Sequence, residues 1–388
     1  MRILFVTSKI DFKSAGGSVP DLDLKVRKLT AMGHHVRVLT VYSSRNDFGS
    51  TPPPYEVIPE QVPRDTRVLP LITIVRDLLR KYESEVDLFH VEGQFGYGSG
   101  YYRKTGGKKP IVIFFNREAV AWTTPQGFVA GLKHQLRTSF EQTVGAHLMN
   151  LNDRFVFTNP RLKDAYQAFG FLSPAIVLGD FVDQKEMRGK IGLAAPDVDR
   201  HRRHTGPLSF IASGRMIPEK GFEEVVRGLA QLPKHIEWNA TLSGDGPERE
   251  RLIALTAELG IHERVAFPGW IDKQELLKKL SHADLFLLPR WHFALTSVIL
   301  LESMAFATPV VVPKDTGLAW VAGAGGYTFT EGSISELAAG ITYLSENGEA
   351  RATLAAGCLT RLSELDPETM AKDLEAWMLE AVTETQST

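Results

Sequence analysis

The strongest constraint on the fold is a pattern of short apolar runs that alternate with amphipathic stretches. Such alternation is typical of parallel sheets in which helices join successive strands. The pattern occurs in two successive series, and 388 residues exceed what one ordinary hydrophobic core supports. We therefore predict an α/β protein of two tandem Rossmann-like, doubly wound domains. Each domain is expected to carry its ligand-binding loops at the carboxyl ends of its strands.

The first series occupies the N-terminal half of the chain. Strands are predicted at Ile3–Thr7, His35–Tyr42, Asp87–Val91, Pro110–Phe115, Arg154–Thr158 and Ala175–Leu178. Helices are predicted at Asp21–Met32 and Leu71–Lys81. A further helix over Phe128–Leu148 is indicated by apolar residues that recur every four positions, namely Phe128, Leu132, Leu136, Phe140, Val144 and Leu148.

The second series predicts strands at Leu208–Ser213, Trp238–Ser243, Arg264–Phe267, Asp284–Leu288, Pro309–Val312 and Gly326–Phe329. Its helices are expected at Phe222–Leu232, Glu248–Leu259, Lys273–Leu280 and Ser297–Phe306. Residues 184–204 are polar and include the charge run Asp199–His204, which predicts a linker. The predicted domains are therefore residues 1–183 and 205–365. Residues 366–388 are expected to form a C-terminal helix that crosses back to the first domain.

The composition argues against several classes of protein. Cys358 is the only cysteine, so no disulfide framework can form and a cytoplasmic location is expected. Residues 1–190 carry 26 Lys and Arg against 19 Asp and Glu, a net +7, and residues 191–388 carry 18 against 27, a net −9. This excess is too diffuse to indicate a nucleic-acid partner. A first half that faces an anionic partner, such as a membrane surface, and a random imbalance are both open.

The helix at Phe128–Leu148 connects this charge to a surface. Its apolar stripe lies beside Lys133, His134 and Arg137, and a second basic cluster consists of Arg103, Lys104, Lys108 and Lys109. Apolar anchors next to cations are what a peripheral membrane protein presents to anionic lipid. The pattern therefore indicates either peripheral membrane contact or a stripe that packs against its own sheet.

The strongest local signal is the segment Ser213–Phe222, which follows a predicted strand and opens a predicted helix. Backbone N–H groups and the helix dipole at such a junction form an anion site. Arg215 can bind phosphate oxygens through its guanidinium fork, and Lys220 can add a point charge. The alternative is that both residues are solvated loop cations.

A second signal is Glu302, which stands alone in the otherwise apolar helix Ser297–Phe306. A carboxylate among Leu, Met and Ala is costly unless a partner satisfies it. A sugar diol is a suitable partner, since a carboxylate accepts from two adjacent hydroxyls. The alternative places Glu302 on the exposed flank of the helix.

Weaker signals come from glycine turns and from one acidic pair. Gly16 and Gly17 precede a helix, and Gly244 lies in a strand-to-helix turn, so these positions allow close approach to a ligand.

Asp21 and Asp23 match an Asp-x-Asp metal signature, but carboxylates two positions apart on a helix do not converge on one ion. We expect no metal and no cofactor.

Taken in order, these segments resemble glycosyltransferase family 4, retaining enzymes of the two-domain GT-B fold. The resemblance covers nearly the whole chain and is most specific in the second half. The segments that carry it are Gly16-Gly17, Gly33-His34, Gly214-Arg215 with Lys220-Gly221, Gly244-Asp245-Gly246-Pro247, Phe267-Pro268-Gly269-Trp270, Ala283–Pro289 and Leu301–Ala305.

The resemblance implies a transferase that moves a sugar from a nucleotide-sugar donor to an unidentified acceptor. The first domain would bind the acceptor, and the second domain would bind the donor. Arg215 and Lys220 would bind the donor diphosphate and stabilise the leaving group, and Glu302 would bind the nucleotide ribose. Further donor contacts are expected from Gly16, Gly17, Gly214, Gly244, Trp270, Ala294, Leu295, Thr296 and Ser297.

Departures from the family pattern keep alternatives open. Ala294 stands where the family has the first of two glutamates, so a catalytically weak or inactive GT-B protein that binds nucleotide-sugar or a partner is one alternative. A GT-B nucleotide-sugar epimerase is another. A dinucleotide oxidoreductase is less favoured, because no Gly-x-Gly-x-x-Gly follows the first strand. On the acceptor side, His90 and Asn116 are the candidates.

Overall fold

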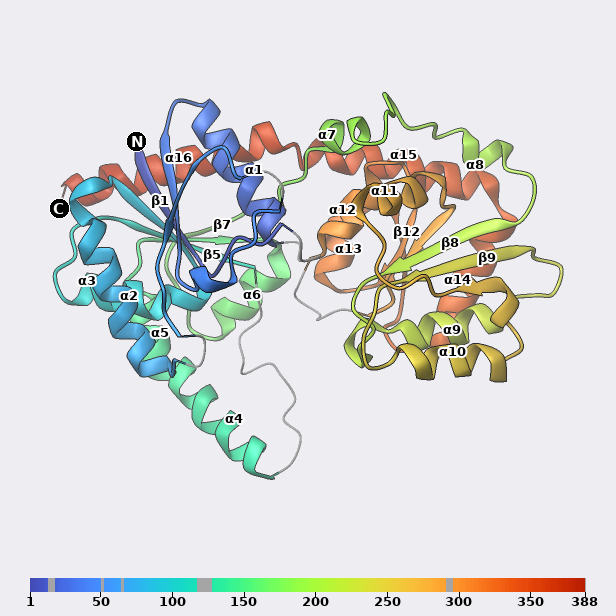
Figure 1. The fold of residues 1–388 in the computed structure, drawn as a ribbon, viewed down its shortest axis with the longest axis horizontal. Coiled ribbons are helices and arrows are strands. Elements are labelled where there is room, and N and C mark those ends of the chain that lie inside the picture. The colour runs from blue at the N-terminus through green and yellow to red at the C-terminus, as the bar shows by residue number, and fades with distance from the viewer. Residues whose placement is uncertain (13–17, 50–51, 64–65, 117–127, 291–295, 388) are drawn as a thin grey trace. The chain divides into compact units, whose positions relative to one another are not determined.

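The protein consists of two compact α/β units. A computed structural model describes residues 1–12, 18–49, 52–63, 66–116, 128–290 and 296–387 (Figure 1). Unit 1 comprises Met1–Phe181 and Pro367–Thr388, and unit 2 comprises Val182–Asp366. The predicted first domain ends at residue 183, and the first segment of unit 1 ends at Phe181.

In the described part of unit 1, seven strands form a parallel sheet in the order β3-β2-β1-β4-β5-β6-β7. The strands are β1 (Arg2–Thr7), β2 (His35–Thr40), β3 (Glu56–Pro59), β4 (Leu88–Glu92), β5 (Ile111–Phe115), β6 (Arg154–Phe157) and β7 (Ala175–Val177). Strand β3 is absent from the sequence prediction. It is a short edge strand whose residues are only partly buried, so it lacks the apolar run that marks the others.

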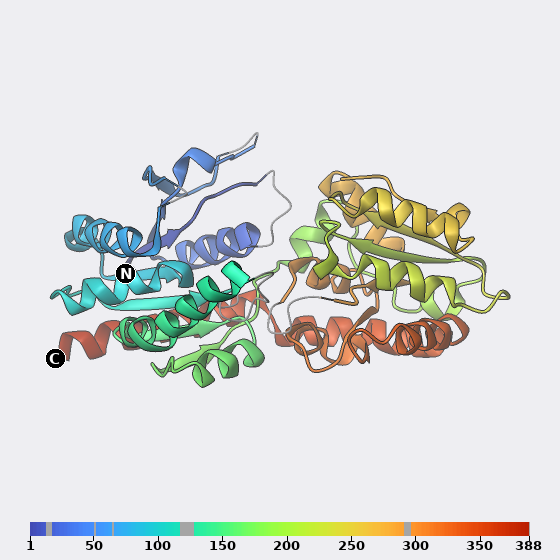
Figure 2. The same cartoon turned by 90° about the horizontal axis from the view of Figure 1, so that it is seen from below.

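The helices of unit 1 cover both faces of its sheet (Figures 1 and 2). Helices α1 and α16 contact each other, and α2 and α5 both contact α3. The helices are α1 (Ser18–Ala31), α2 (Val68–Tyr82), α3 (Gly96–Lys104), α4 (Phe128–Phe140), α5 (Ala146–Met149), α6 (Pro160–Ala168) and α16 (Pro367–Ser387). A π-helical segment, Glu141–Gly145, joins α4 to α5, so the predicted helix Phe128–Leu148 is interrupted.

Helix α16 is held to unit 1 by specific contacts. The Arg154 guanidinium lies 4.1 Å from the centroid of the Trp377 ring and donates to Glu380 Oε2 at 2.8 Å and to Glu384 Oε1 at 2.7 Å. The Trp377 indole Nε1 donates to the Phe155 carbonyl at 3.2 Å. These contacts place the last helix against the strand that carries Arg154 and Phe155.

In the described part of unit 2, six strands form a parallel sheet in the order β10-β9-β8-β11-β12-β13, which completes the predicted fold class of two doubly wound domains. The strands are β8 (Leu208–Ser213), β9 (Trp238–Ser243), β10 (Val265–Ala266), β11 (Leu285–Leu287), β12 (Val310–Pro313) and β13 (Gly326–Phe329). The helices are α7 (Gln184–Gly189), α8 (Arg200–Arg203), α9 (Phe222–Ala230), α10 (Arg249–Glu258), α11 (Lys273–His282), α12 (Val298–Met304), α13 (Gly317–Ala322), α14 (Ile334–Glu346) and α15 (Gly348–Glu364).

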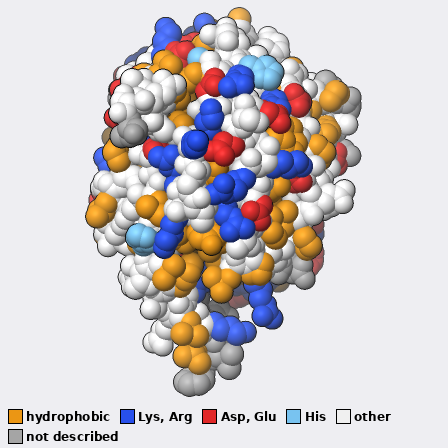
Figure 3. Space-filling model, turned by 90° about the vertical axis from the view of Figure 1, so that its left-hand side faces the viewer, with side chains coloured by type: hydrophobic (Ala, Val, Ile, Leu, Met, Phe, Trp, Pro, Cys, Tyr) orange, Lys and Arg blue, Asp and Glu red, His pale blue; other side chains and the backbone are white. Residues whose placement is uncertain are grey.

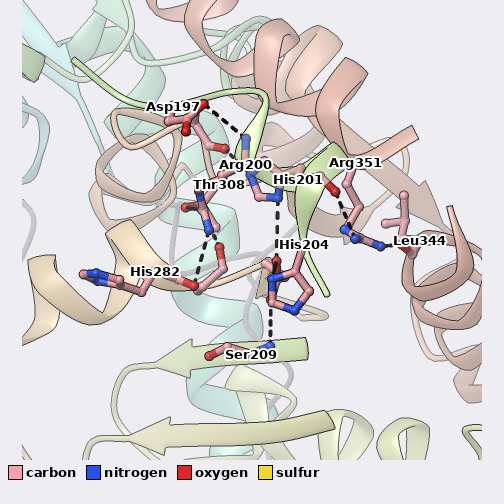
Figure 4. A network of polar contacts seen from close by, with 12 residues as sticks. Asp197, Arg200, His201, His204, Ser209, His282, Thr308, Leu344 and Arg351 are labelled. Carbon is pink, nitrogen blue, oxygen red and sulfur yellow. Dashed lines mark hydrogen bonds and ion pairs between the residues drawn. The ribbon is translucent and has the colours of Figure 1, made fainter. Parts of the chain in front are cut away.

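Residues 184–204, predicted as a linker, belong to unit 2 and contain α7 and α8. Figure 4 shows the polar network that anchors α8. Arg200 donates to the Ala283 carbonyl at 2.6 Å, and His201 Nε2 lies 2.9 Å from the Ala307 carbonyl. Arg351 donates to the His201 carbonyl at 3.1 Å. Within the charge run, Arg200 and His201 therefore bond buried backbone carbonyls of distant segments, whereas Arg202 and Arg203 are exposed.

A buried ion pair fixes α1 within unit 1. Lys25 and Asp21 are each 1% exposed, and Lys25 Nζ donates to Asp21 Oδ2 at 2.7 Å. The other Asp21 oxygen accepts from the Phe181 N–H at 2.7 Å, and Lys25 Nζ lies 3.4 Å from the centroid of the Phe114 ring. Burial lowers the pKa of Lys25, while Asp21 opposes that shift. Asp21 therefore ties α1 to the segment that ends unit 1's first stretch.

This pair yields a stability prediction. Asp21→Ala should lower the free energy of unfolding by about 3–5 kcal/mol, because it leaves the Lys25 charge buried without its partner. Asp23→Ala on the same helix should cost about 1 kcal/mol or less, since the Asp23–Arg27 pair is partly exposed to solvent. Urea denaturation of both variants provides the comparison, and equal losses would contradict it. The double variant Asp21→Leu/Lys25→Met should recover most of the stability.

Candidate functional site

The carboxyl ends of β8 and β9 meet through direct backbone contact. A Cβ on Gly244 would lie 1.8 Å from the Gly214 carbonyl oxygen, and a Cβ on Gly246 would lie 2.4 Å from the Met216 carbonyl oxygen. Gly214, Gly244 and Gly246 have φ angles of 152°, 124° and 157°, a region that favours glycine. Only glycine therefore fits at Gly244 and Gly246.

Hydrogen bonds hold these loops in register. The Gly214 N–H donates to the Ser243 carbonyl at 3.0 Å, and the Met216 N–H donates to the Asp245 carbonyl at 2.8 Å. The Gly244 N–H donates to the Gly269 carbonyl at 2.8 Å, which brings in the loop that carries Trp270. Trp270 is 53% exposed, so its ring is available to a ligand. Three predicted donor residues, Gly214, Gly244 and Trp270, are thereby placed on adjoining loops.

The two predicted cations lie between β8 and α9. Arg215 is exposed, and Lys220 is half-buried in the short 3-10 turn Pro218–Lys220. Gly221 follows with a left-handed φ of 70° and begins α9. Burial, reinforced by the nearby Arg215 charge, lowers the pKa of Lys220 to about 7. A lysine with a lowered pKa beside a second cation favours an anionic ligand, because an anion restores the lysine's charged form.

A third cation, Arg290, was not identified from the sequence. A Cβ on Gly221 would lie 2.8 Å from the Arg290 Cβ, so the chain after β11 runs against the start of α9. Arg290 Nη2 lies 2.5 Å from Glu224 Oε1. Its place directly after Leu288-Pro289, at the carboxyl end of a strand, is the signal that could have identified it.

Glu302 is 3% exposed on α12, so the alternative of an exposed helix flank is wrong. Lys273 Nζ, at the start of α11, donates to Glu302 Oε1 at 2.5 Å. This lysine is half exposed and was also missed by sequence reasoning. The pair places a buried carboxylate of an apolar helix next to a basic side chain that solvent can reach.

The remaining predicted donor residues divide into two groups. Ser297 is the N-cap residue of α12 and is 7% exposed, and Thr296 precedes it. Gly16, Gly17, Ala294 and Leu295 lie outside the described residues.

The two acceptor-side candidates have different surroundings. His90 is 3% exposed, and its ring stacks on Phe5 with centroids 4.2 Å apart. Burial lowers the pKa of His90 to about 3, so the ring is neutral and lies in the core, which does not support an acceptor contact. Asn116 is half-buried and lines a cavity of about 550 Å³ in unit 1.

Among the described residues, no group of three or more His, Cys, Asp or Glu side chains is arranged to hold a metal ion. Asp21 and Asp23, which match the Asp-x-Asp metal signature, each pair with a different basic side chain. Asp21 pairs with Lys25, and Asp23 pairs with Arg27 at 2.8 Å.

The architecture of both units is that of GT-B glycosyltransferase structures. Sucrose-phosphate synthase from Thermosynechococcus elongatus matches with a TM-score of 0.76 at 19% identity, over 98% of this chain and 99% of that chain. HepE from Anabaena, solved in complex with UDP, matches with a TM-score of 0.73 at 19% identity, over 98% of this chain and 100% of that chain. At these identities the likeness establishes the fold, which is GT-B.

The second unit also matches a sequence family. Residues 196–357 match the family described as glycosyl transferases group 1. The lipopolysaccharide core biosynthesis glycosyltransferase LpsE of Rhizobium meliloti (strain 1021) is 38% identical over 110 residues, which cover 28% of this chain and 31% of that protein. The chain thus spans about a third of the length of this curated relative. The matched region includes Arg215, Lys220 and Glu302 within the family segment.

The contact between the two glycine loops yields a second prediction. Gly244→Ala should destabilise the protein by more than about 4 kcal/mol, because its Cβ overlaps the Gly214 carbonyl and forces the loops apart. Gly260→Ala is the matched control, since Gly260 also has a positive φ of 71° but no atom within 4 Å of an added Cβ. The control should cost only about 1–2 kcal/mol. Urea denaturation that gives similar losses for the two variants would contradict the assignment.

Proposed function

We propose that this chain is a retaining glycosyltransferase that transfers a sugar from a nucleotide-sugar donor to an acceptor. The observation that carries the proposal is the cationic junction between β8 and α9, where Arg215 and the half-buried Lys220 adjoin a helix N-terminus. The GT-B fold and the family match over residues 196–357 support the same reading. The UDP in the HepE structure supports a nucleotide-diphosphate ligand for this fold.

The mechanism that follows is charge stabilisation of a leaving diphosphate. As the bond to the sugar breaks, negative charge grows on the departing phosphate. Arg215, Lys220 and the N-terminus of α9 would stabilise it, a task that metal ions perform elsewhere. The departing phosphate would itself help to remove the proton from the acceptor hydroxyl, as the resemblance to retaining GT-B enzymes implies.

Glu302 is proposed to bind the ribose. Its buried carboxylate accepts from Lys273 through Oε1, and the carboxylate retains capacity to accept from a hydroxyl. Trp270, exposed on the loop that the Gly244 N–H contacts, is proposed as a further donor contact.

Turnover of a panel of UDP-, GDP-, ADP- and TDP-sugars, with and without acceptor extracts, tests the function. Arg215→Ala should lower turnover about 10²-fold or more, the scale of removing one preorganised charge. Arg227→Ala is the control, because Arg227 pairs with Glu223 farther along α9. Near-normal turnover in Arg215→Ala would contradict the diphosphate assignment. Interconversion of donor epimers without acceptor would indicate an epimerase instead.

The pKa of Lys220 predicts a pH dependence of nucleoside diphosphate binding. Below pH 7 the lysine is already protonated, so affinity should be level. Above about pH 7 the free protein loses this proton and binding must recover it, so affinity should fall by up to tenfold per pH unit. Lys220→Arg should remain charged and lose this dependence while retaining affinity. Calorimetry of nucleoside diphosphate binding from about pH 6 to about pH 9 provides the test. A wild-type affinity that stays level across this range would contradict the prediction.

We also propose that unit 1 contacts an anionic membrane surface through α4, at the cytoplasmic face. Leu132 and Leu136 are 53% and 66% exposed on this helix, and Val144 in the π-helical segment is 54% exposed. Lys133 and Arg137 lie beside them. Figure 3 shows hydrophobic and basic side chains adjoining at the lower end of unit 1, where Figure 1 places α4. No described helix is both long and apolar enough to cross a membrane.

Vesicle sedimentation tests this contact. The protein should sediment with phosphatidylglycerol vesicles at low salt, be released by rising salt, and stay unbound with phosphatidylcholine. Leu132→Gln/Leu136→Gln should weaken the binding severalfold, whereas Leu379→Gln, an exposed leucine of α16, should not. Equal binding to both kinds of vesicle, or no effect of the double variant, would argue against a role of α4.

A further inference from the structure

Unit 1 contains a cavity of about 550 Å³ that the donor site does not use. It lies where β4 and β5 end, since Gly93, Gln94 and Phe95 follow β4, Phe115 ends β5 and Asn116 follows it. Ligands of open parallel sheets bind outside these carboxyl ends. Its volume is also in the range of small-molecule pockets, about 300–1,000 Å³.

The interior of the cavity is mainly apolar. Phe115 and Tyr166 form its aromatic wall, with ring centroids 4.5 Å apart. Met149 and Val75, both almost fully buried, line it as well. Among the residues that the structure describes, no side chain fills the space between these residues. A buried hydroxyl needs a hydrogen-bond partner, so a wall of this kind accommodates a hydrocarbon better than a saccharide.

Exposed aliphatic side chains border the same cavity. Val68 and Leu71 line it at the start of α2, and Val68 is 37% exposed. On the opposite wall, Arg137 and Glu141 line it, and Leu136 next to them is 66% exposed. Aliphatic side chains that remain in water around an apolar cavity indicate a partner that is itself apolar.

The charged groups of the lining leave a net positive charge. Glu141 is 5% exposed in the π-helical segment, and its Oε1 lies 3.6 Å from Arg137 Nε. Arg137 thereby offsets Glu141. Arg67 also lines the cavity, and no described residue forms an ion pair with its exposed guanidinium. One surplus cation beside an apolar cavity matches an anionic headgroup attached to a hydrocarbon chain.

We propose that this cavity receives the hydrocarbon chain of the acceptor, and that the acceptor is an amphiphile with an anionic head. The chain enters between α2 and the α4–α5 segment, and the head meets Arg67. This inference rests on the proposed glycosyltransferase function and names the class of its acceptor. The π-helical segment supports it, since such segments recur at functional sites, and this one places Glu141 in the cavity wall.

A chain-length series tests the apolar part. Butyl, hexyl and octyl phosphate, used below micelle formation, should bind with affinity that rises by up to about fourfold per buried CH₂. Butyl to octyl phosphate should then improve affinity on the order of a hundredfold. Calorimetry on the full chain measures this, and equal affinities across the series would overturn the proposal.

Two variants locate the site. Leu71→Trp places a larger side chain on the cavity wall and should reduce octyl phosphate affinity at least about tenfold, the loss of two or more buried methylenes. Leu69→Trp is the matched control, since Leu69 is exposed on the same helix and does not line the cavity, and it should bind as the wild type. Equal effects of the two variants would overturn the location.

A second comparison tests the head. Arg67→Gln should weaken octyl phosphate several-fold and leave octyl glucoside unchanged, because only the phosphate meets the guanidinium. Equal weakening of both ligands would overturn the assignment of Arg67. UDP affinity, measured in parallel, reports on the proposed donor site and not on this cavity. Loss of alkyl phosphate binding with intact UDP binding and sugar turnover would reject this inference only, whereas absent sugar turnover would reject the proposed function.

Discussion

The proposed donor site of unit 2 depends on two loops that touch backbone to backbone. Where Gly244 meets the Gly214 carbonyl there is no room for a side chain, and both residues use φ angles that favour glycine. This contact sets the path from β8 into α9, and therefore the positions of Arg215 and Lys220. It also fixes the Gly269 carbonyl, and with it Trp270. The backbone contact between the two loops thus determines where the charged side chains of the site lie.

Most of the fold was predictable, because buried parallel strands leave apolar runs and covering helices leave a periodic pattern. The exceptions are segments whose local sequence pattern does not show the contacts that they make in the folded chain. Strand β3 has too little burial to show an apolar run. Residues 184–204 read as a polar linker, yet Arg200 and His201 satisfy carbonyls of residues about 80–110 positions away, which no local signal could reveal.

The residues of the candidate site also fall into two groups, those that a local pattern predicts and those that depend on tertiary packing. Arg215 and Lys220 are candidates that the sequence can predict, because a strand, a turn and a helix start lie together in one segment. Lys273 was missed, since its partner Glu302 is 29 residues away and the pair forms only when α11 and α12 pack. The cavity of unit 1 has no sequence signature at all. Its shape comes from how α2, the π-helical segment and β5 meet, and hydrophobic periodicity alone described the region around Phe128–Leu148 as one continuous helix.

Unit 2 is inserted between the two segments of unit 1, and this has a consequence for synthesis on the ribosome. Residues 182–366 emerge as one continuous stretch before α16 does. At about 5–20 residues per second, the surface that Trp377 and its neighbours cover waits roughly 10–40 s for its last helix. Unit 1 begins first in the sequence, but its synthesis is completed after that of unit 2. Unit 2 can finish folding while unit 1 still exposes the apolar face that the buried side chains of α16 later cover.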